Sequence, residues 1–260
     1  MRGRTLFVPG DSGLHRLNPL TKLELSLLFI ILAATLPSLL WLLGAFLFLL
    51  IPLSAWGGVL SPFLRRCLAV ITPFVISLSI IQGFFTPGET PLFRFSVFVF
   101  TLEGWLTGLT VASRLLLAIG GALLLMLSTR PDMLMLALTQ SGLPGSLAYV
   151  VLTSIQIFPR FQERAEVILD AQQARGLEIR VNIFRRLRLL VPLVGPLVLS
   201  SIVETEERAM ALEARAFSRP GRKTSLLVLR DSGWQRVARW VFLIVMLMLI
   251  SFRVWWAFTS

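Results

Sequence analysis

The stretch 23–53 constrains the fold most, because its 31 residues hold only one charge, Glu24, next to its start. In lipid such a segment must satisfy its backbone hydrogen bonds internally, which a helix does. One straight helix would reach about 46 Å, too long for a hydrocarbon core of roughly 30 Å. Because Pro37 and Ser38 interrupt the stretch, it predicts two short membrane spans meeting near Pro37. One bent helix is the alternative.

Three further apolar stretches are long enough to span a bilayer, at about 67–85, 103–128 and 237–258. The stretch 93–100 instead alternates and is rich in aromatic and β-branched residues, so we expect it to run extended at the membrane surface. The sequence therefore predicts an all-α, multi-pass membrane protein with about five transmembrane helices and additional cytoplasmic helices.

Composition agrees with that class. Hydrophobic residues make up 55% of the chain, charged residues only 15%, and the mean hydropathy is +0.79. The net charge is +11, and the basic residues lie in the segments between apolar stretches. This distribution fits the positive-inside rule better than binding to nucleic acid. This pattern predicts a cytoplasmic N-terminus, and its main carriers are Arg2, Arg4, Arg16, Lys22, Arg65 and Arg66.

Span positions and charge together predict three parts: a bundle of about four helices (1–128), a cytoplasmic region with polar helices (129–236) and a last transmembrane helix (237–260). Within the middle part, 143–158 is apolar between prolines and is expected to lie in the interface or re-enter the membrane. The stretch 189–203 is short and broken by proline and glycine, so it is not counted as a span.

Catalytic chemistry is poorly represented. The chain has one cysteine and one histidine, which excludes a disulfide within the chain, a zinc cluster and a multi-histidine metal site. The segment 221–225 lacks the glycine that precedes the lysine of a phosphate-binding loop. We expect no catalytic residue, no bound cofactor and no metal ion.

Two segments forty residues apart each place one arginine among small residues, near the predicted ends of helices at 160–176 and 200–217. The residues concerned are Ala174, Arg175 and Gly176 in the first segment and Ala214, Arg215 and Ala216 in the second. A guanidinium on a small-residue surface can enter a partner's groove and bind a carboxylate through two hydrogen bonds. Alternatively, each arginine only balances a helix dipole or reaches lipid headgroups.

These motifs resemble those of the transmembrane T component of energy-coupling factor (ECF) transporters. The stretch 14–22 (LHRLNPLTK) is similar to the family's N-terminal signature, and Glu103-Gly104 with the later Arg114 resembles its fourth span. The two arginine segments are similar to the family's two Ala-Arg-Gly motifs. The second departs from the pattern, because Ala216 stands where glycine is common.

The departure at Ala216 allows two interpretations. If the position must be left-handed, alanine costs roughly 1–2 kcal/mol there. Alternatively, the helix runs on to Pro220-Gly221.

The resemblance implies a non-catalytic subunit in a prokaryotic cell membrane. Arg175 and Arg215 would each contact one of two ABC-type ATPase subunits, and a small membrane-embedded S component would bind a vitamin or transition-metal ion. A permease subunit of a conventional ABC importer, with its own solute path, is the alternative. A membrane-embedded enzyme would need clustered His, Asp or Glu at membrane depth, which the spans do not offer.

Two features inside the spans are open to more than one interpretation. Arg114 is an intramembrane charge and therefore a functional candidate, or else it lies near a headgroup or is paired within the bundle. Gly104 and Gly108 match a small-xxx-small packing face, a pattern that also occurs by chance.

Overall fold

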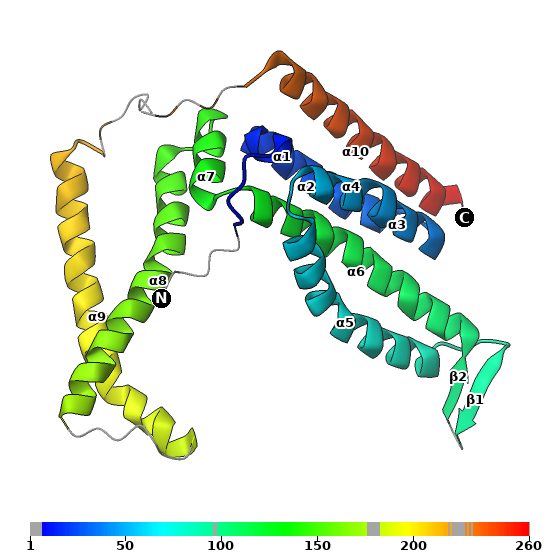
Figure 1. The fold of residues 1–260 in the computed structure, drawn as a ribbon, viewed down its shortest axis with the longest axis horizontal. Helices are drawn as coiled ribbons and strands as arrows, with labels where there is room; N and C mark the ends of the chain where they lie inside the picture. Colours follow the sequence, from blue (N-terminus) through cyan, green and yellow to red (C-terminus); the bar gives the residue numbers. More distant parts are fainter. Residues whose placement is uncertain are drawn as a thin grey trace. The chain divides into compact units, whose positions relative to one another are not determined.

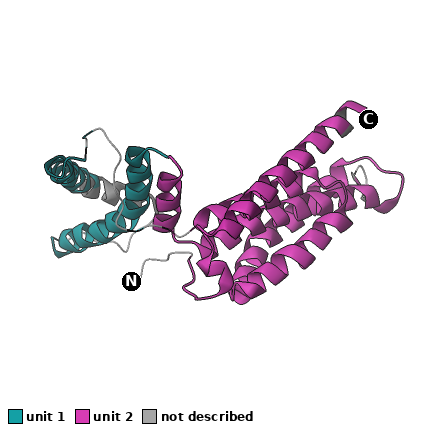
Figure 2. Cartoon of the chain, turned by 90° about the horizontal axis from the view of Figure 1, so that it is seen from above, with its two compact units in different colours: residues 1–3, 143–228 teal, residues 4–142, 229–260 magenta. Residues whose placement is uncertain are grey.

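The computed structural model describes residues 7–95, 98–175, 183–217, 219, 227, 229 and 231–259. These residues are almost entirely helical, with one short β-hairpin, so the predicted all-α membrane class is confirmed. The chain divides into two compact units, one made of 4–142 with 229–260 and the other containing 143–228 (Figure 2). We call them the membrane unit and the coupling unit.

The membrane unit is a bundle of helices that pack side by side along much of their length (Figure 1). Its elements are α1 (Gly13–Arg16), α2 (Pro19–Thr35), α3 (Leu39–Ala45), the π-helix η1 (Phe46–Leu50), α4 (Ile51–Trp56), α5 (Leu60–Phe85), β1 (Pro91–Phe95), β2 (Phe98–Thr101), α6 (Leu102–Ser128), α7 (Pro131–Gln140) and α10 (Gly233–Thr259).

Four helical segments are long and apolar enough to cross a membrane: Leu39–Trp56, Leu60–Phe85, Leu102–Ser128 and Gly233–Trp255. The stretch 23–53 forms two helical segments separated at Pro37, so the alternative of one bent helix is wrong. Its first half is α2, whose 17 residues reach about 25 Å, slightly less than the hydrocarbon core. Among the described residues no spanning segment falls within 129–232, in agreement with not counting 189–203.

The closest helix packing joins α5 and α6, and it depends on glycine. A methyl group on Gly104 would lie 2.3 Å from the carbonyl oxygen of Gln82, and one on Gly108 would lie 2.7 Å from that of Leu78. These distances are too short for any side chain, so the two backbones touch directly. The small-xxx-small pattern is therefore a packing face and not a chance occurrence.

The β-hairpin closes the far end of this helix pair. β1 and β2 pair antiparallel, so the extended course expected for 93–100 is confirmed in the described residues. The carboxylate of Glu103 accepts hydrogen bonds from Thr90 Oγ1 at 2.6 Å and from the Thr90 backbone N–H at 3.2 Å. The first turn of α6 thereby fixes the loop that leads into β1.

The coupling unit contains two long helices, α8 (Gly145–Ala174) and α9 (Ile183–Ala214). Both are longer than the segments predicted at 160–176 and 200–217, because each also includes the apolar stretch that precedes it. Pro159 lies inside α8 without ending it. The predicted starts of the two helices, at 160 and 200, were therefore too late in the chain.

A substitution at Gly108 tests the contact between α5 and α6. We expect Gly108→Ala to lower the free energy of unfolding by about 1–3 kcal/mol, because its methyl group would force the two backbones apart. Gly44→Ala, in α3, is the matched control, since nothing lies within 4 Å of the added methyl group. Thermal unfolding of the purified variants in detergent measures the difference. Equal midpoints for the two variants would contradict the packing argument.

Candidate coupling surface

Both arginines of the repeated motif occupy the same position in their helices. α8 ends at Ala174 and α9 at Ala214, so Arg175 and Arg215 are the residues that directly follow each helix. The backbone N–H of Arg175 donates to the carbonyl of Gln172 at 3.1 Å, and that of Arg215 donates to Leu212 at 3.2 Å. Both residues are exposed, and neither forms an ion pair with any described residue.

Ala216 has a left-handed backbone, with φ of 56°. The N–H of Phe217 donates to the carbonyl of Leu212 at 2.9 Å, and that of Ala216 donates to Glu213 at 2.8 Å. This pair of bonds defines a Schellman cap, in which the left-handed residue is usually glycine. The alternative in which the helix continues to Pro220 is therefore wrong. Gly176, the corresponding residue of the first motif, lies outside the described residues.

An aromatic contact holds the end of α9 against the start of α8. The rings of Phe217 and Tyr149 have their centroids 5.2 Å apart at a tilt of 53°. Phe217 is also the residue whose N–H completes the Schellman cap. The backbone that carries Arg215 is therefore fixed on both sides, by the cap and by the ring contact.

Glu204 joins the two helices at their middle, a role that sequence reasoning missed. Its carboxylate lies 2.7 Å from Nη2 of Arg164 and 3.5 Å from Nη1 of Arg160, both on α8, and 2.5 Å from Nη2 of Arg208 on α9. Arg164 also donates to the carbonyl of Ser200 at 3.3 Å. The one signal in the sequence was the spacing of four between Glu204 and Arg208, which is typical of a helical ion pair.

The charge state of Glu204 follows from these contacts. Desolvation acts to raise its pKa, but the hydrogen bond from Arg208 and the positive charges of Arg208, Arg164 and Arg160 outweigh it. The pKa of Glu204 is therefore held below its ordinary value, and the carboxylate is ionised at neutral pH. One anion thus offsets part of the charge of three cations at the crossing of the helices.

The pairings define an antiparallel arrangement of α8 and α9 (Figure 1). Because Arg175 and Arg215 each follow the C-terminus of their helix, they lie at opposite ends of the pair. Arg175 follows Arg164 by 11 residues, and Arg215 follows Glu204 by the same number. At 1.5 Å per residue, each arm extends about 16 Å from the crossing, in opposite directions. The two guanidinium groups therefore cannot share one carboxylate on a partner.

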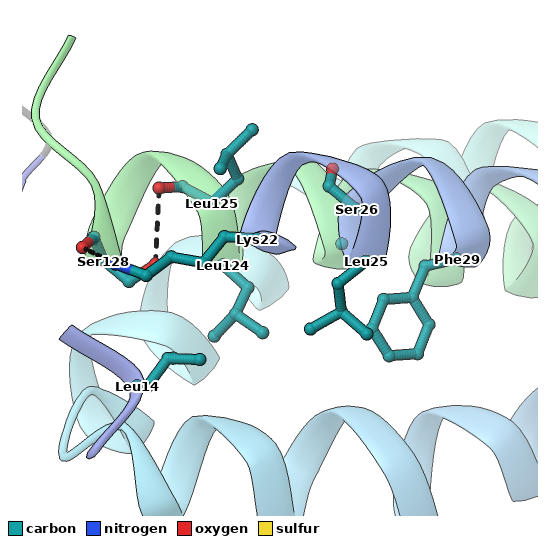
Figure 3. Close-up of a pocket in the computed structure, with 9 residues that line it drawn as sticks. Leu14, Lys22, Leu25, Ser26, Phe29, Leu124, Leu125 and Ser128 are labelled. Atoms are coloured by element: carbon teal, nitrogen blue, oxygen red, sulfur yellow. Dashed lines mark hydrogen bonds between the residues drawn. The ribbon is translucent and has the colours of Figure 1, made fainter. Parts of the chain in front are cut away.

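The N-terminal signature forms a second cluster of contacts, in the membrane unit. The side chain of Asn18 accepts a hydrogen bond from the N–H of Leu20 at 3.0 Å, and Pro19 begins α2. The backbone N–H of Asn18 donates to Gln235 Oε1 of α10 at 3.0 Å. The buried Nζ of Lys22 donates to the carbonyl of Ser128 at 2.9 Å (Figure 3). It also donates to the carbonyl of His15 at 3.2 Å. The signature thus ties α1, α2, α6 and α10 together.

His15 is a structural residue in this cluster. Its Nε2 lies 2.9 Å from the carbonyl oxygen of Val8, and its Nδ1 lies 2.7 Å from Ser12 Oγ, which donates to the carbonyl of Gly57. Both ring nitrogens are therefore occupied by protein groups. Within the described residues no three His, Cys, Asp or Glu side chains gather as metal ligands.

Arg114 lies near the middle of α6. Of the three interpretations of this residue, the structure supports the one in which it is paired within the bundle. Its Nη2 donates to the carbonyl of Leu36 at 3.3 Å. Leu36 caps the C-terminus of α2, where carbonyl groups lack partners in the helix. The guanidinium thereby compensates the break that Pro37 imposes.

Known proteins resemble this chain over nearly its whole length. The profile of the family described as cobalt transport protein (CbiQ) matches residues 10–226. The chain belongs to this family, that of the T components of energy-coupling factor transporters. The recognition made from the arginine motifs and the N-terminal signature is therefore confirmed.

Individual relatives are named as transmembrane proteins of energy-coupling factor transporters. The energy-coupling factor transporter transmembrane protein EcfT of Clostridium kluyveri is 29% identical over 260 residues, which cover 96% of each chain. The proteins of the same name from Heliobacterium modesticaldum and Lacticaseibacillus paracasei are 33% and 30% identical. Those two alignments cover 87% and 86% of this chain and 88% of each relative. The chain is thus a membrane protein related to transporter subunits.

The left-handed alanine makes a testable prediction about the second motif. We expect Ala216→Gly to stabilise the end of α9 by about 1–2 kcal/mol, because glycine adopts this conformation without a steric penalty. Ala214→Gly, two residues earlier and still helical, should destabilise it by about 1 kcal/mol. Hydrogen exchange of the amides at 212–217 reports both changes. Faster exchange in Ala216→Gly would show that the cap does not form.

The crossing of α8 and α9 provides a second prediction. At pH 7 we expect Glu204→Gln to cost about 1–2 kcal/mol, because three arginines lose their shared anion. The pKa of Glu204 is lower in the folded protein than the ordinary glutamate pKa of about 4.3. The stabilisation by its carboxylate is therefore fully present above that ordinary pKa, and it is lost as the pH falls through the pKa of the folded protein. Thermal unfolding of wild type and variant should therefore converge at low pH.

The control for Glu204 is Glu206→Gln, which removes an exposed glutamate from the same helix. It should leave the unfolding midpoint nearly unchanged at both pH values. An equal loss of stability in the two variants at pH 7 would assign the effect to net charge rather than to the contacts of Glu204.

Proposed function

We propose that this chain is the coupling subunit of an energy-coupling factor importer in a prokaryotic cell membrane. A pair of ABC-type ATPase subunits binds at Arg175 and Arg215, and a small membrane-embedded S component binds the vitamin or transition-metal ion. The chain itself carries no catalytic residue. ATP-driven closure of the ATPase pair moves α8 and α9, and this movement reaches the S component.

The observation that carries the proposal is the matching position of the two arginines. Each directly follows a long helix, is exposed, and lies 11 residues beyond the ionic crossing at Glu204. An exposed arginine with a fixed backbone can bind a carboxylate in a groove at little cost in conformational entropy. Two such residues pointing in opposite directions fit two separate subunits. A headgroup contact would not require this matched placement.

Apolar surface on the coupling unit supports a membrane-embedded partner. Several large hydrophobic side chains of α8 and α9 are exposed, among them Val150, Phe158, Val198 and Leu199. Exposed apolar patches of this kind mark protein or membrane interaction sites. The charged ends of the same helices would meet soluble ATPases, whereas this apolar surface would meet the S component.

The proposal places the N-terminus and the coupling region 129–236 in the cytoplasm. Arginine and lysine gather before and at the start of α2 (Arg16, Lys22) and near the start of α5 (Arg65, Arg66), as the positive-inside rule requires of cytoplasmic ends of spans. ATPase subunits that use cellular ATP must bind on the same side. Loop charge and the proposed partners therefore agree on one orientation.

A conventional importer permease is the second candidate. Such a subunit would carry the solute itself and would need a polar path between its spans. A cavity of about 290 Å³ between α3, η1, α5 and α6 is instead lined by apolar side chains apart from Ser113. That lining favours a coupling role over transport through this chain.

Arginine substitutions test the proposal. We expect Arg175→Ala and Arg215→Ala each to weaken binding of the ATPase pair by about 2 kcal/mol or more, because a charge-assisted contact is lost and a partner carboxylate is left unpaired. The double variant should bind less than either single variant. Lysine at either position should restore binding only in part, since it lacks the planar fork. Co-purification of the ATPases and substrate uptake by cells measure these effects.

Arg253→Ala is the charge-matched control, because Arg253 lies near the end of α10, outside the coupling unit. It should leave binding and uptake unchanged. If the double variant Arg175→Ala/Arg215→Ala accumulates normally and still binds ATPases and imports substrate like wild type, the coupling proposal fails.

A further inference from the structure

A cavity of about 290 Å³ lies within the membrane unit, between α3 and η1 on one side and α5 and α6 on the other. Its floor is formed by four buried residues, and its rim by two exposed leucines. The floor residues are Cys67, Ile71, Ala112 and Ser113, and the rim residues are Leu43 and Leu68. The cavity is therefore a groove that opens sideways from the bundle.

The groove has the direction and length of one lipid chain. Along α5 its lining runs from Leu64 to Val75, a distance of about 17 Å. That is about half of a hydrocarbon core of roughly 30 Å, the depth of one leaflet. α5 is itself a spanning helix, so the groove runs across the bilayer as an acyl chain does. An empty apolar groove of this size would forfeit many dispersion contacts.

A charge lies at one end of the groove. Arg65 precedes the rim residue Leu68 by three positions, so the two are neighbours on the surface of α5. Side chains of a helix tilt toward its N-terminus, which places the guanidinium beyond the groove, toward the membrane surface. Arg65 is exposed and has no ion pair with any described residue. Its guanidinium can therefore bind the phosphate of a lipid headgroup.

We propose that this groove binds one anionic phospholipid, with an acyl chain against Cys67 and Ala112 and the headgroup at Arg65. The lipid belongs to the leaflet that contains Arg65. Its chain fills the space between α3 and α5, where side chains leave a gap. The binding site is independent of the coupling role of Arg175 and Arg215.

Native mass spectrometry of the purified chain tests this site, with phosphatidylglycerol and phosphatidylcholine of identical acyl chains as probes. Wild type should retain one phosphatidylglycerol about fivefold more tightly than phosphatidylcholine, the effect of about one basic residue at a membrane surface. Arg65→Gln should abolish that preference. Ser113→Leu, which fills the groove from its floor, and Leu68→Trp, which fills it from its rim, should each lose both lipids.

Two controls separate the groove from general lipid binding. Arg253→Gln removes a basic residue from α10, and Leu106→Trp enlarges an exposed residue of α6 outside the groove. Both should bind lipid like wild type, and size-exclusion chromatography should show every variant to be monodisperse. Equal binding of the two lipids by wild type would overturn the proposal. The proposal would also be overturned if Ser113→Leu or Leu68→Trp retained the lipid. Loss of a co-purified membrane protein in place of the lipid would assign the groove to that protein and would likewise overturn the proposal.

Discussion

A helix that ends inside an apolar environment leaves carbonyl groups without partners, and the membrane unit depends on how these are satisfied. α2 ends beside Pro37, and Arg114 of α6 donates to the carbonyl of Leu36. α6 in turn ends at Ser128, whose carbonyl accepts from the buried Lys22 of α2. Each helix thus supplies the cation that the other helix needs at its end. This exchange fixes the antiparallel register of the pair.

Once α2 and α6 are in register, the rest of the membrane unit follows from close packing. α6 presents Gly104 and Gly108 to α5 on one side and Gly121 to Phe29 of α2 on the other. Each glycine lets a neighbouring helix approach to a distance that any side chain would prevent. A shift of α6 by one residue would turn these glycines away and place larger side chains in the contacts. The cations and the glycines therefore specify the same arrangement.

The sequence alone predicted the features that depend on local chemistry. The break at Pro37 followed from a proline, and the family followed from the N-terminal signature and two spaced arginine motifs. It did not predict the lengths of α8 and α9, because a proline such as Pro159 stops a helix only where neighbouring contacts do not hold it. The role of Glu204 in joining the two helices was also missed, because its partner Arg164 on α8 lies 40 residues away and only tertiary packing brings them together.

The second motif shows how tertiary packing can replace the residue that local rules favour. Glycine would adopt the left-handed conformation at position 216 freely, and alanine adopts it at a cost of roughly 1–2 kcal/mol. The two backbone bonds to Leu212 and Glu213 and the contact between Phe217 and Tyr149 offset that cost. The chain direction after α9 is therefore set by several interactions at once.

Under the proposed function, the two ends of the coupling unit would have to work as a pair, because the ATPases proposed to bind them would move together. Antiparallel helices that cross at one point are related by an approximate two-fold axis, and the arms from Arg164 to Arg175 and from Glu204 to Arg215 are equal in length. Most pairs of identical or similar subunits are also two-fold symmetric. A coupling element with equal arms can meet such a pair without favouring either subunit. In that proposal, opposite displacements of the two arms would balance at the ionic crossing of Glu204 with Arg164. The rigidity of this crossing would then set how much of each movement reaches the exposed apolar side chains of α8 and α9.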